Sequence, residues 1–287
     1  MRKETKPRVG PLLVTAALLF SLTPAQINAQ WLEAKGAHYV VIYQPGSEKD
    51  VAFTRRWLDH AEMLMKSKYG VSPIHYHLSI YLYPAPADDI DVDQSGQIKC
   101  CTRTAAGLST GTIKLLALSA PVWKTANLRS SLGLAKSGED YHAKVLMSEY
   151  IPIGHYAVQD ARGPGGWQYY DAPEWFVQGL QEYDGIFHTT DTNRTLTAGR
   201  LFAWAKRNTA KFSCCSPKLQ IVDAYNGGAT FLAFLADEFG EGIHARLLRS
   251  SAKTFDAALD NETKRYSRDE LFARFRKWLD GNQVNQP

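Results

Sequence analysis

Apolar and polar residues alternate along several short segments in the first part of the chain. HYVVIYQPG at His38–Gly46 and HLSIYLYPAPADD at His77–Asp89 combine this alternation with turn residues at their ends, which is typical of strands. GTIKLLALSAP at Gly111–Pro121 predicts another strand. Glu48–Tyr69, between the first two, has the apolar spacing of an amphipathic helix. These patterns predict a small sheet accompanied by one helix.

From about Asp140 onward the helical period replaces the alternation, and no strand is evident. The sequence therefore predicts an α+β domain with a β-rich lobe at residues 30–139 and a helical lobe at residues 140–287. There is no internal repeat or low-complexity segment. Helices are expected at Tyr141–Tyr150, Pro173–Ile186, Asn193–Lys206, Asp223–Phe239, Gly242–Phe255 and Ser267–Asp280.

Residues 1–29 have the pattern of a secretory signal peptide. MRKETKPR is basic, Pro11–Leu22 is apolar, and small residues precede a cleavage site expected near Ala25 or Ala29. The apolar run is short for a membrane span, although an uncleaved anchor or a buried helix are alternatives. No later segment approaches membrane length. We expect a secreted or periplasmic protein that is not attached to a membrane after the signal is removed.

Removal of this leader changes the charge of the protein. The whole chain has 33 Lys and Arg residues and 29 Asp and Glu residues. The leader holds four of the basic residues and one acidic residue, which leaves 29 and 28 from Gln30 onward. A nearly neutral chain without a basic stripe argues against binding to nucleic acid. About 258 residues then remain, enough for one large domain.

The four cysteines form two adjacent pairs, Cys100-Cys101 and Cys214-Cys215. In an oxidising compartment, two bridges that join the early pair to the late pair would connect distant segments. Vicinal disulfides or free thiols are the alternatives. The spacing does not fit a structural zinc motif.

Two segments together carry the most specific pattern of the chain. KVLMSEYIPIGHYAVQ at Lys144–Gln159 precedes PEWFVQGLQEY at Pro173–Tyr183, and AYNGGATFLAFLADEFG follows at Ala224–Gly240. In this order they resemble the helices of peptidase MA-like, gluzincin-type metallopeptidases. The resemblance covers most of the chain after the leader and implies a thermolysin-like fold: a twisted N-terminal sheet followed by a helical subdomain.

The resemblance also defines where a catalytic zinc site would lie. In such families the first helix carries His-Glu-x-x-His, whose histidines share one helix face and bind Zn²⁺ while the Glu activates water. In the register set by Glu149, the histidine positions are occupied here by Ser148 and Pro152. The glutamate ligand of the second helix is replaced by Gln178, and a neutral amide binds zinc more weakly than a carboxylate. These substitutions predict that the zinc site is lost.

A rebuilt site is the alternative. Glu149 would remain the general base, with His155 and either Glu182 or Glu174 as ligands. His155 follows Glu149 by six residues, roughly 240° around a continuous helix. Pro152 is expected to kink or end the helix, and only such a break would bring His155 back toward Glu149.

Other residues are weaker candidates. Tyr225 is a candidate oxyanion-stabilising phenol, and His142, seven residues before Glu149, is a distant candidate ligand. The loop Ala161–Pro173 is a candidate cleft wall or lid. Nearby aromatic residues either form a platform for a peptide or sugar, or, as we favour, pack between helices. They are Trp167, Tyr169, Tyr170, Trp175 and Tyr183.

The sequence contains no Gly-x-Ser-x-Gly elbow, P-loop or dinucleotide-binding motif. Ser148, Glu149 and His155 do not make a convincing triad, because local spacing says nothing about triad geometry. The leading hypothesis is an exported pseudopeptidase without a cofactor, which binds or regulates other polypeptides. The alternative is a divergent zinc peptidase that hydrolyses polypeptides.

Overall fold

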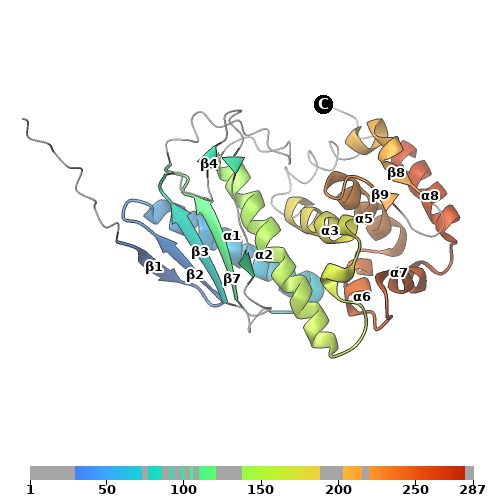
Figure 1. Cartoon of the computed structure of the whole chain (residues 1–287), viewed down its shortest axis with the longest axis horizontal. Helices are drawn as coiled ribbons and strands as arrows, with labels where there is room; N and C mark the ends of the chain where they lie inside the picture. Colours follow the sequence, from blue (N-terminus) through green and yellow to red (C-terminus); the bar gives the residue numbers. More distant parts are fainter. Residues whose placement is uncertain are drawn as a thin grey trace, which may run out of the picture. The chain divides into compact units, whose positions relative to one another are not determined.

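The computed structural model describes residues 30–72, 77–85, 91–92, 98–99, 104–105, 110–120, 138–187, 203–214 and 220–281. The described residues from Trp31 onward belong to one compact unit. Apart from one helix after the second strand and a short pair of strands near residues 212–221, strands precede helices along the chain, so the protein is α+β as expected (Figure 1). No helix among the described residues has both the length and the apolarity needed to cross a membrane.

The main sheet is mixed and has the strand order β1-β2-β3-β7-β6. β1 pairs antiparallel with β2, β2 and β3 pair in parallel, β3 and β7 pair in parallel, and β6 pairs antiparallel with β7. A separate two-stranded ladder joins β4 and β5. The bounds of these strands are β1 Leu32–Lys35, β2 Tyr39–Tyr43, β3 His77–Tyr83, β4 Asp91–Val92, β5 Ile98–Lys99, β6 Thr104–Ala105 and β7 Thr110–Leu116.

The alternation in the sequence divides the sheet into two unlike faces. Val41, Ile80 and Ile113 are fully buried and belong to the hydrophobic core, on the side where α1 and α2 lie (Figure 1). Their neighbours in the strands, such as Val40 and Tyr81, are only half-buried. Successive side chains of a strand point to opposite faces, so this alternation places one face against the helices and leaves the other partly exposed.

The helix expected at Glu48–Tyr69 is present, but its last turn differs from the rest. The α-helix α1 spans Glu48–Leu64 and continues as the π-helical turn η1, Met65–Tyr69. Gly70 ends it in the left-handed conformation, with φ of 64°, which glycine adopts without steric cost. Wide π turns are uncommon and often occur at functional sites. This turn directs Lys68 and Tyr69 toward the helical lobe.

Among the described residues, six longer helices and two short 3-10 turns form most of the second lobe (Figure 1). The α-helices are α2 Gly138–Arg162, α3 Glu174–Phe187, α5 Asn226–Phe239, α6 Ile243–Arg249, α7 Phe255–Thr263 and α8 Arg268–Gly281, and the 3-10 turns are η3 Tyr169–Asp171 and η4 Thr209–Lys211. Residues 203–207 are also helical, and the rest of the helix expected at Asn193–Lys206 lies outside the described residues.

Two expectations for this lobe were wrong. A single helix was expected at Gly242–Phe255, but α6 ends at Arg249 and a new helix, α7, begins at Phe255. The side chain of Thr254 accepts a hydrogen bond from the backbone N–H of Ala257 and thereby caps the start of α7. Strands were not expected here, yet β8 Phe212–Ser213 pairs antiparallel with β9 Gln220–Ile221. Strands of two residues are too short to produce a visible alternation.

Pro152 was expected to kink or end the first site helix; the expected end was wrong, whereas a kink stays a prediction. α2 continues ten residues beyond Pro152, to Arg162. Proline removes one backbone hydrogen bond and crowds the carbonyl of Ser148, but Ile151, Pro152 and Ile153 are buried in the core. Gly154 adds to this packing, because a Cβ there would clash with the Met65 side chain. Tertiary packing therefore outweighs the local preference to break the helix.

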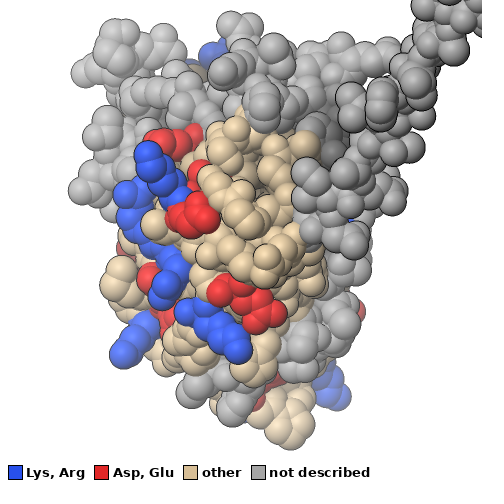
Figure 2. All heavy atoms as spheres, turned by 90° about the vertical axis from the view of Figure 1, so that its left-hand side faces the viewer, with Lys and Arg blue, Asp and Glu red and all other residues tan. Residues whose placement is uncertain are grey.

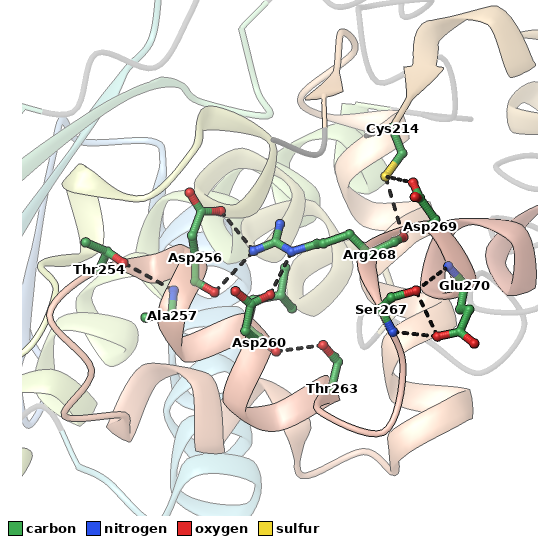
Figure 3. A network of polar contacts seen from close by, with 11 residues as sticks. Cys214, Thr254, Asp256, Ala257, Asp260, Thr263, Ser267, Arg268, Asp269 and Glu270 are labelled. Atoms are coloured by element: carbon green, nitrogen blue, oxygen red, sulfur yellow. Dashed lines mark hydrogen bonds and ion pairs between the residues drawn. The ribbon is translucent and has the colours of Figure 1, made fainter. Parts of the chain in front are cut away.

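The corner between α7 and α8 is held by polar contacts (Figure 3). The guanidinium of Arg268 donates to the Asp260 carboxylate at 2.7 Å and to the Asp256 carboxylate at 3.2 Å. Ser267 and Glu270 form a capping box, in which each side chain accepts from the backbone N–H of the other residue. The Cys214 sulfur lies 3.5 Å from the carbonyl oxygen of Arg268. The other three cysteines lie outside the described residues, so the disulfide pairing stays a prediction.

Helices α3 and α5 approach each other through glycines. A Cβ on Gly179 would lie 2.5 Å from the carbonyl carbon of Gly228, and one on Gly228 would clash with the carbonyl oxygen of Trp175. Neither position has room for a side chain, because the obstacle in both cases is backbone. This close approach fixes where the start of α5 lies against the second site helix.

We therefore expect Gly228→Ala to lower the free energy of unfolding by about 1–3 kcal/mol, because the two helices must move apart. Gly281→Ala, whose Cβ would meet nothing within 4 Å, is the matched control and should stay within about 0.5 kcal/mol of wild type. Urea unfolding followed by circular dichroism measures both. An equal effect of the two substitutions would contradict the close approach.

Candidate functional site

The residues at the predicted zinc-site positions lie on α2 and α3. A Cβ on Gly185 would be 3.4 Å from the backbone nitrogen of Ser148, so the two helices pass close to each other at the first altered ligand position. Ser148, Glu149 and Gln178 are half-buried. These three side chains therefore lie at the boundary between the solvent and the hydrophobic core.

Tyr225, the candidate oxyanion-stabilising residue, immediately precedes α5. The Tyr225 side chain is 47% exposed. Its pKa is raised, first by partial burial and then by the negative charges of Glu182, Glu174 and Glu149. The charges of the predicted base and of both predicted carboxylate ligands thus reach the same phenol, but among the described residues these carboxylates do not form a group that could hold a metal ion. Glu182 is buried, with 4% exposure, whereas Glu174 is exposed.

His155, the third member of the rebuilt set, lies elsewhere. It is fully buried, and both of its ring nitrogens have partners. Nε2 is 2.8 Å from the Asp184 carboxylate and Nδ1 is 3.0 Å from the Tyr169 hydroxyl. Since α2 is continuous, the angular separation of roughly 240° from Glu149 remains, and His155 would have to give up one of these bonds to reach a metal.

Asp184 is the centre of a buried charged cluster, formed with Lys68, Tyr69 and His155. Its carboxylate accepts a hydrogen bond of 2.6 Å from the Lys68 ammonium, one of 2.5 Å from the Tyr69 hydroxyl, and the His155 contact. The Asp184 side chain is 0% exposed and that of Lys68 is 11% exposed. The cluster therefore joins the π turn of the first lobe to both site helices.

Burial by itself raises the pKa of the Asp184 carboxyl, but the Lys68 ammonium and the His155 hydrogen bond outweigh it. The pKa is held well below its ordinary value, so the group is an anion that only accepts hydrogen bonds. It follows that Nε2 of His155 carries a proton. The same carboxylate, after the larger effect of burial, raises the pKa of the Tyr69 hydroxyl well above its ordinary value, which keeps that phenol protonated as a donor.

Nδ1 of His155 faces the hydroxyl of Tyr169. This hydroxyl has one proton, so it donates to one acceptor at a time. That hydroxyl lies 3.0 Å from Nδ1 of His155 and 3.2 Å from the backbone carbonyl oxygen of Val177. A neutral His155 accepts this proton at Nδ1, and the ion pair of Lys68 with Asp184 then leaves the cluster without net charge. An interior position favours that state, since an unbalanced buried charge is costly.

Two further histidines are buried and neutral. His244 donates from Nε2 to the carbonyl oxygen of Leu232 at 3.0 Å, and burial lowers its pKa to about 3. Burial also lowers the pKa of His142 to about 3. Within the part of the chain that the structure describes, neither ring nitrogen of His142 has a hydrogen-bond partner. His142 contacts the ring of Phe53 at 5.8 Å between centroids, so its surroundings are those of a core residue.

Most of the aromatic residues between the site helices are part of the core. Four of the five have an exposure of 4% or less, and Tyr170 alone is exposed, at 53%. The four buried residues are Trp167, Tyr169, Trp175 and Tyr183. Edge-on contacts with neighbouring phenylalanines, such as those of Trp167 with Phe176 and Phe255, are typical of helix packing.

The loop between α2 and α3 is anchored at its middle. Gln159 accepts from the backbone N–H of Tyr169 at 2.7 Å, and Arg162 donates to the carbonyl oxygens of Trp167, at 3.1 Å, and of Ser250, at 2.8 Å. The loop is thus fixed to α2 and to the segment after α6. These contacts favour a wall over a moving lid.

The residues at the altered positions do not fit a catalytic zinc ion. Ser148 and Gln178 are poor ligands and Pro152 has no donor atom, while both ring nitrogens of His155 are hydrogen-bonded. Among the described residues, no group of three or more His, Cys, Asp or Glu side chains is arranged to hold a metal ion. The residues at these positions therefore support no zinc-dependent chemical step.

Sequence reasoning missed Asp184, Lys68 and Tyr69. A signal was present, because Asp184 interrupts an otherwise apolar end of the second site helix. Its partners, however, are 115 and 116 residues away in the sequence, and no spacing rule connects the two segments.

No family model matches the chain, and no curated protein matches its sequence.

Proposed function

We propose that the protein is an exported, gluzincin-like pseudopeptidase that binds a polypeptide on the surface formed by Glu149, Gln178 and Tyr225. The order of sheet, α1, α2, α3 and α5 supports this scaffold, since it follows the order of the resembling sequence segments. The observation that carries the proposal is the state of His155. Its ring completes a hydrogen-bonded cluster in the core, so the histidine that a rebuilt site would need serves folding instead.

The charge of the surface indicates what kind of polypeptide it binds. Glu149, Glu174 and Glu182 all act on the Tyr225 hydroxyl, and this phenol is half-exposed. A segment with Lys or Arg side chains would pair with the exposed Glu174 carboxylate, and its aliphatic stems would pack on the phenol. The ligand we propose is therefore a basic peptide segment.

The alternative is a zinc peptidase in which Glu149 activates water and Glu182 or Glu174 contributes a ligand. This alternative draws on the negative charges of Glu149, Glu174 and Glu182, which all raise the pKa of the Tyr225 hydroxyl. The two functions differ in zinc content, which is measured by incubating the purified protein with excess Zn²⁺, removing unbound metal and determining zinc per chain. We expect no retained zinc. About one zinc per chain that is lost in Glu182→Gln, together with hydrolysis that is lost in Glu149→Gln, would establish the alternative.

Peptide binding tests the proposed function directly. An immobilised protein should retain Lys- and Arg-containing members of a random peptide library, and Glu174→Gln should weaken retention several-fold. Glu139→Gln, an exposed position at the start of α2, is the matched control and should bind like wild type. Equal retention of basic and acidic peptides would contradict the proposal.

A further inference from the structure

The strand β1 lies at the edge of the main sheet, next to β2 alone among the described strands. It is at the left in Figure 1, on the side that Figure 2 turns toward the viewer, where acidic and basic side chains are interspersed. Glu33 and Lys35 of this strand are exposed. An edge strand offers a row of backbone N–H and C=O groups to another strand.

The hydrogen bonds between β1 and β2 determine which residues of β1 direct their backbone N–H and C=O groups away from β2. The backbone N–H of Gly36 donates to the carbonyl oxygen of Tyr39 at 2.8 Å. Gly36 and Tyr39 are the next opposed residues of the ladder after the pair of Lys35 with Val40. In an antiparallel ladder, directly opposed pairs alternate between bonded and non-bonded. Gly36, Ala34 and Leu32 therefore bond to β2. The backbone groups of Glu33 and Lys35 point away from it, toward the free edge.

The same two residues carry opposite charges on side chains that share a face. If a second β1 approached antiparallel about a two-fold axis at Ala34, Glu33 of each copy would stand directly opposite Lys35 of the other. These would be the bonded pairs of the new ladder, because they are the residues whose backbone groups point outward. The strand sequence LEAK is thus self-complementary in charge and in hydrogen bonding at one register.

Trp31 directly precedes β1 and lies at the same edge of the sheet. Its side chain packs edge-on against Tyr81 and Tyr83, at 5.9 and 5.3 Å between ring centroids, and still remains 38% exposed. The two-fold register sets Trp31 of one copy opposite Ala37 of the other. Ala37 lines a hollow of about 320 Å³ together with Glu33, Lys35 and residues of β2 and β3, so the surface beside this position is concave.

We propose that a second copy of this chain docks on β1, and that the two main sheets join antiparallel through Glu33–Lys35 pairs into one continuous sheet. The ladder is short, so its buried area falls below that of a stable dimer. The dimer is therefore expected to be weak and to form as the concentration rises from about 1 µM to about 1 mM. Added salt should weaken it, because the cross-strand charges are exposed.

Charge exchange tests the register. The protein is purified in the form that the cell produces, its N-terminus is defined by mass spectrometry, and its mass in solution is measured by sedimentation equilibrium. Glu33→Lys and Lys35→Glu each create two like-charge pairs per dimer and should weaken association about ten-fold or more. The double variant restores opposite charges in exchanged positions and should recover wild-type association.

Lys253→Glu is the matched control, since it makes the same change in net charge as Lys35→Glu at an exposed position after α6. It should associate like wild type, and thermal melts should show all variants equally folded. A wild-type protein that stays monomeric over the whole range would overturn the proposal. So would single variants that dimerise normally, or a double variant that remains monomeric.

Discussion

Asp184→Asn is expected to lower the free energy of unfolding by about 3–5 kcal/mol, the usual cost of removing one partner from a buried ion pair. The asparagine has nearly the same shape, so the change removes charge and little packing. The Lys68 ammonium, whose side chain is 11% exposed, would then lack its anion. The hydroxyl of Tyr69 and Nε2 of His155 would share an amide oxygen, a weaker acceptor than the carboxylate.

A double-mutant cycle with Lys68→Met separates charge from shape. Lys68→Met alone leaves the Asp184 carboxylate buried with two neutral donors and should also destabilise the protein. The combination with Asp184→Asn removes both charges, so its cost should be clearly less than the sum of the two single costs. Urea unfolding at pH 7 measures all four proteins. Costs that simply add would mean that the two residues do not interact, against the 2.6 Å contact.

The π turn explains why this cluster escaped sequence reasoning while the sheet did not. The alternation at Tyr39–Tyr43 and His77–Tyr83 directly reflects which face of a strand is buried, so local pattern predicts it. The position of Lys68 and Tyr69 depends on one extra residue in the last turn after α1. Helical periodicity does not distinguish that turn from an α-helical one, and the partner Asp184 is known only once the lobes are packed.

In the candidate site, too, some features follow from local sequence pattern and others depend on the packed fold. The second-helix positions Glu174, Gln178 and Glu182 follow from helical spacing, and the structure places their helix beside α2. Whether His155 could approach Glu149 depended on Pro152, where local rules predict a break in the helix. The break does not occur because Ile151 and Ile153 are buried on either side of Pro152, and burial of this kind is a property of the whole fold. His155 therefore faces Asp184, and the resemblance in sequence overestimated its availability to a metal.

Acidification from pH 6.5 to pH 4.5 is expected to lower the free energy of unfolding by about 5 kcal/mol through His142 and His244 together. Both are neutral in the folded protein, because burial lowers the pKa of each from its ordinary value of 6.5 to about 3. Below pH 6.5 the unfolded chain takes up two protons that the folded chain does not, so stability falls with decreasing pH. Each histidine contributes about 1.4 kcal/mol per pH unit, and neither contributes above pH 7.

Asp184 acts in a different range, because its folded pKa is depressed. The stability that its carboxylate provides is present above the ordinary pKa of an aspartate and is lost only at lower pH. The window from pH 6.5 to pH 4.5 therefore reports mainly on groups that are neutral when folded. Urea unfolding in a series of buffers across this window measures the slope.

His142→Leu isolates one of the two contributions. Neither ring nitrogen of His142 has a hydrogen-bond partner among the described residues, so a leucine of similar volume loses no bond and should leave stability at pH 7.5 unchanged or higher. The slope below pH 6.5 should fall by about 1.4 kcal/mol per pH unit. His77→Gln, at an exposed position, should keep the wild-type slope. A His142→Leu curve parallel to wild type would mean that His142 gains its proton in the folded protein as readily as in the unfolded chain, which burial without a partner does not allow.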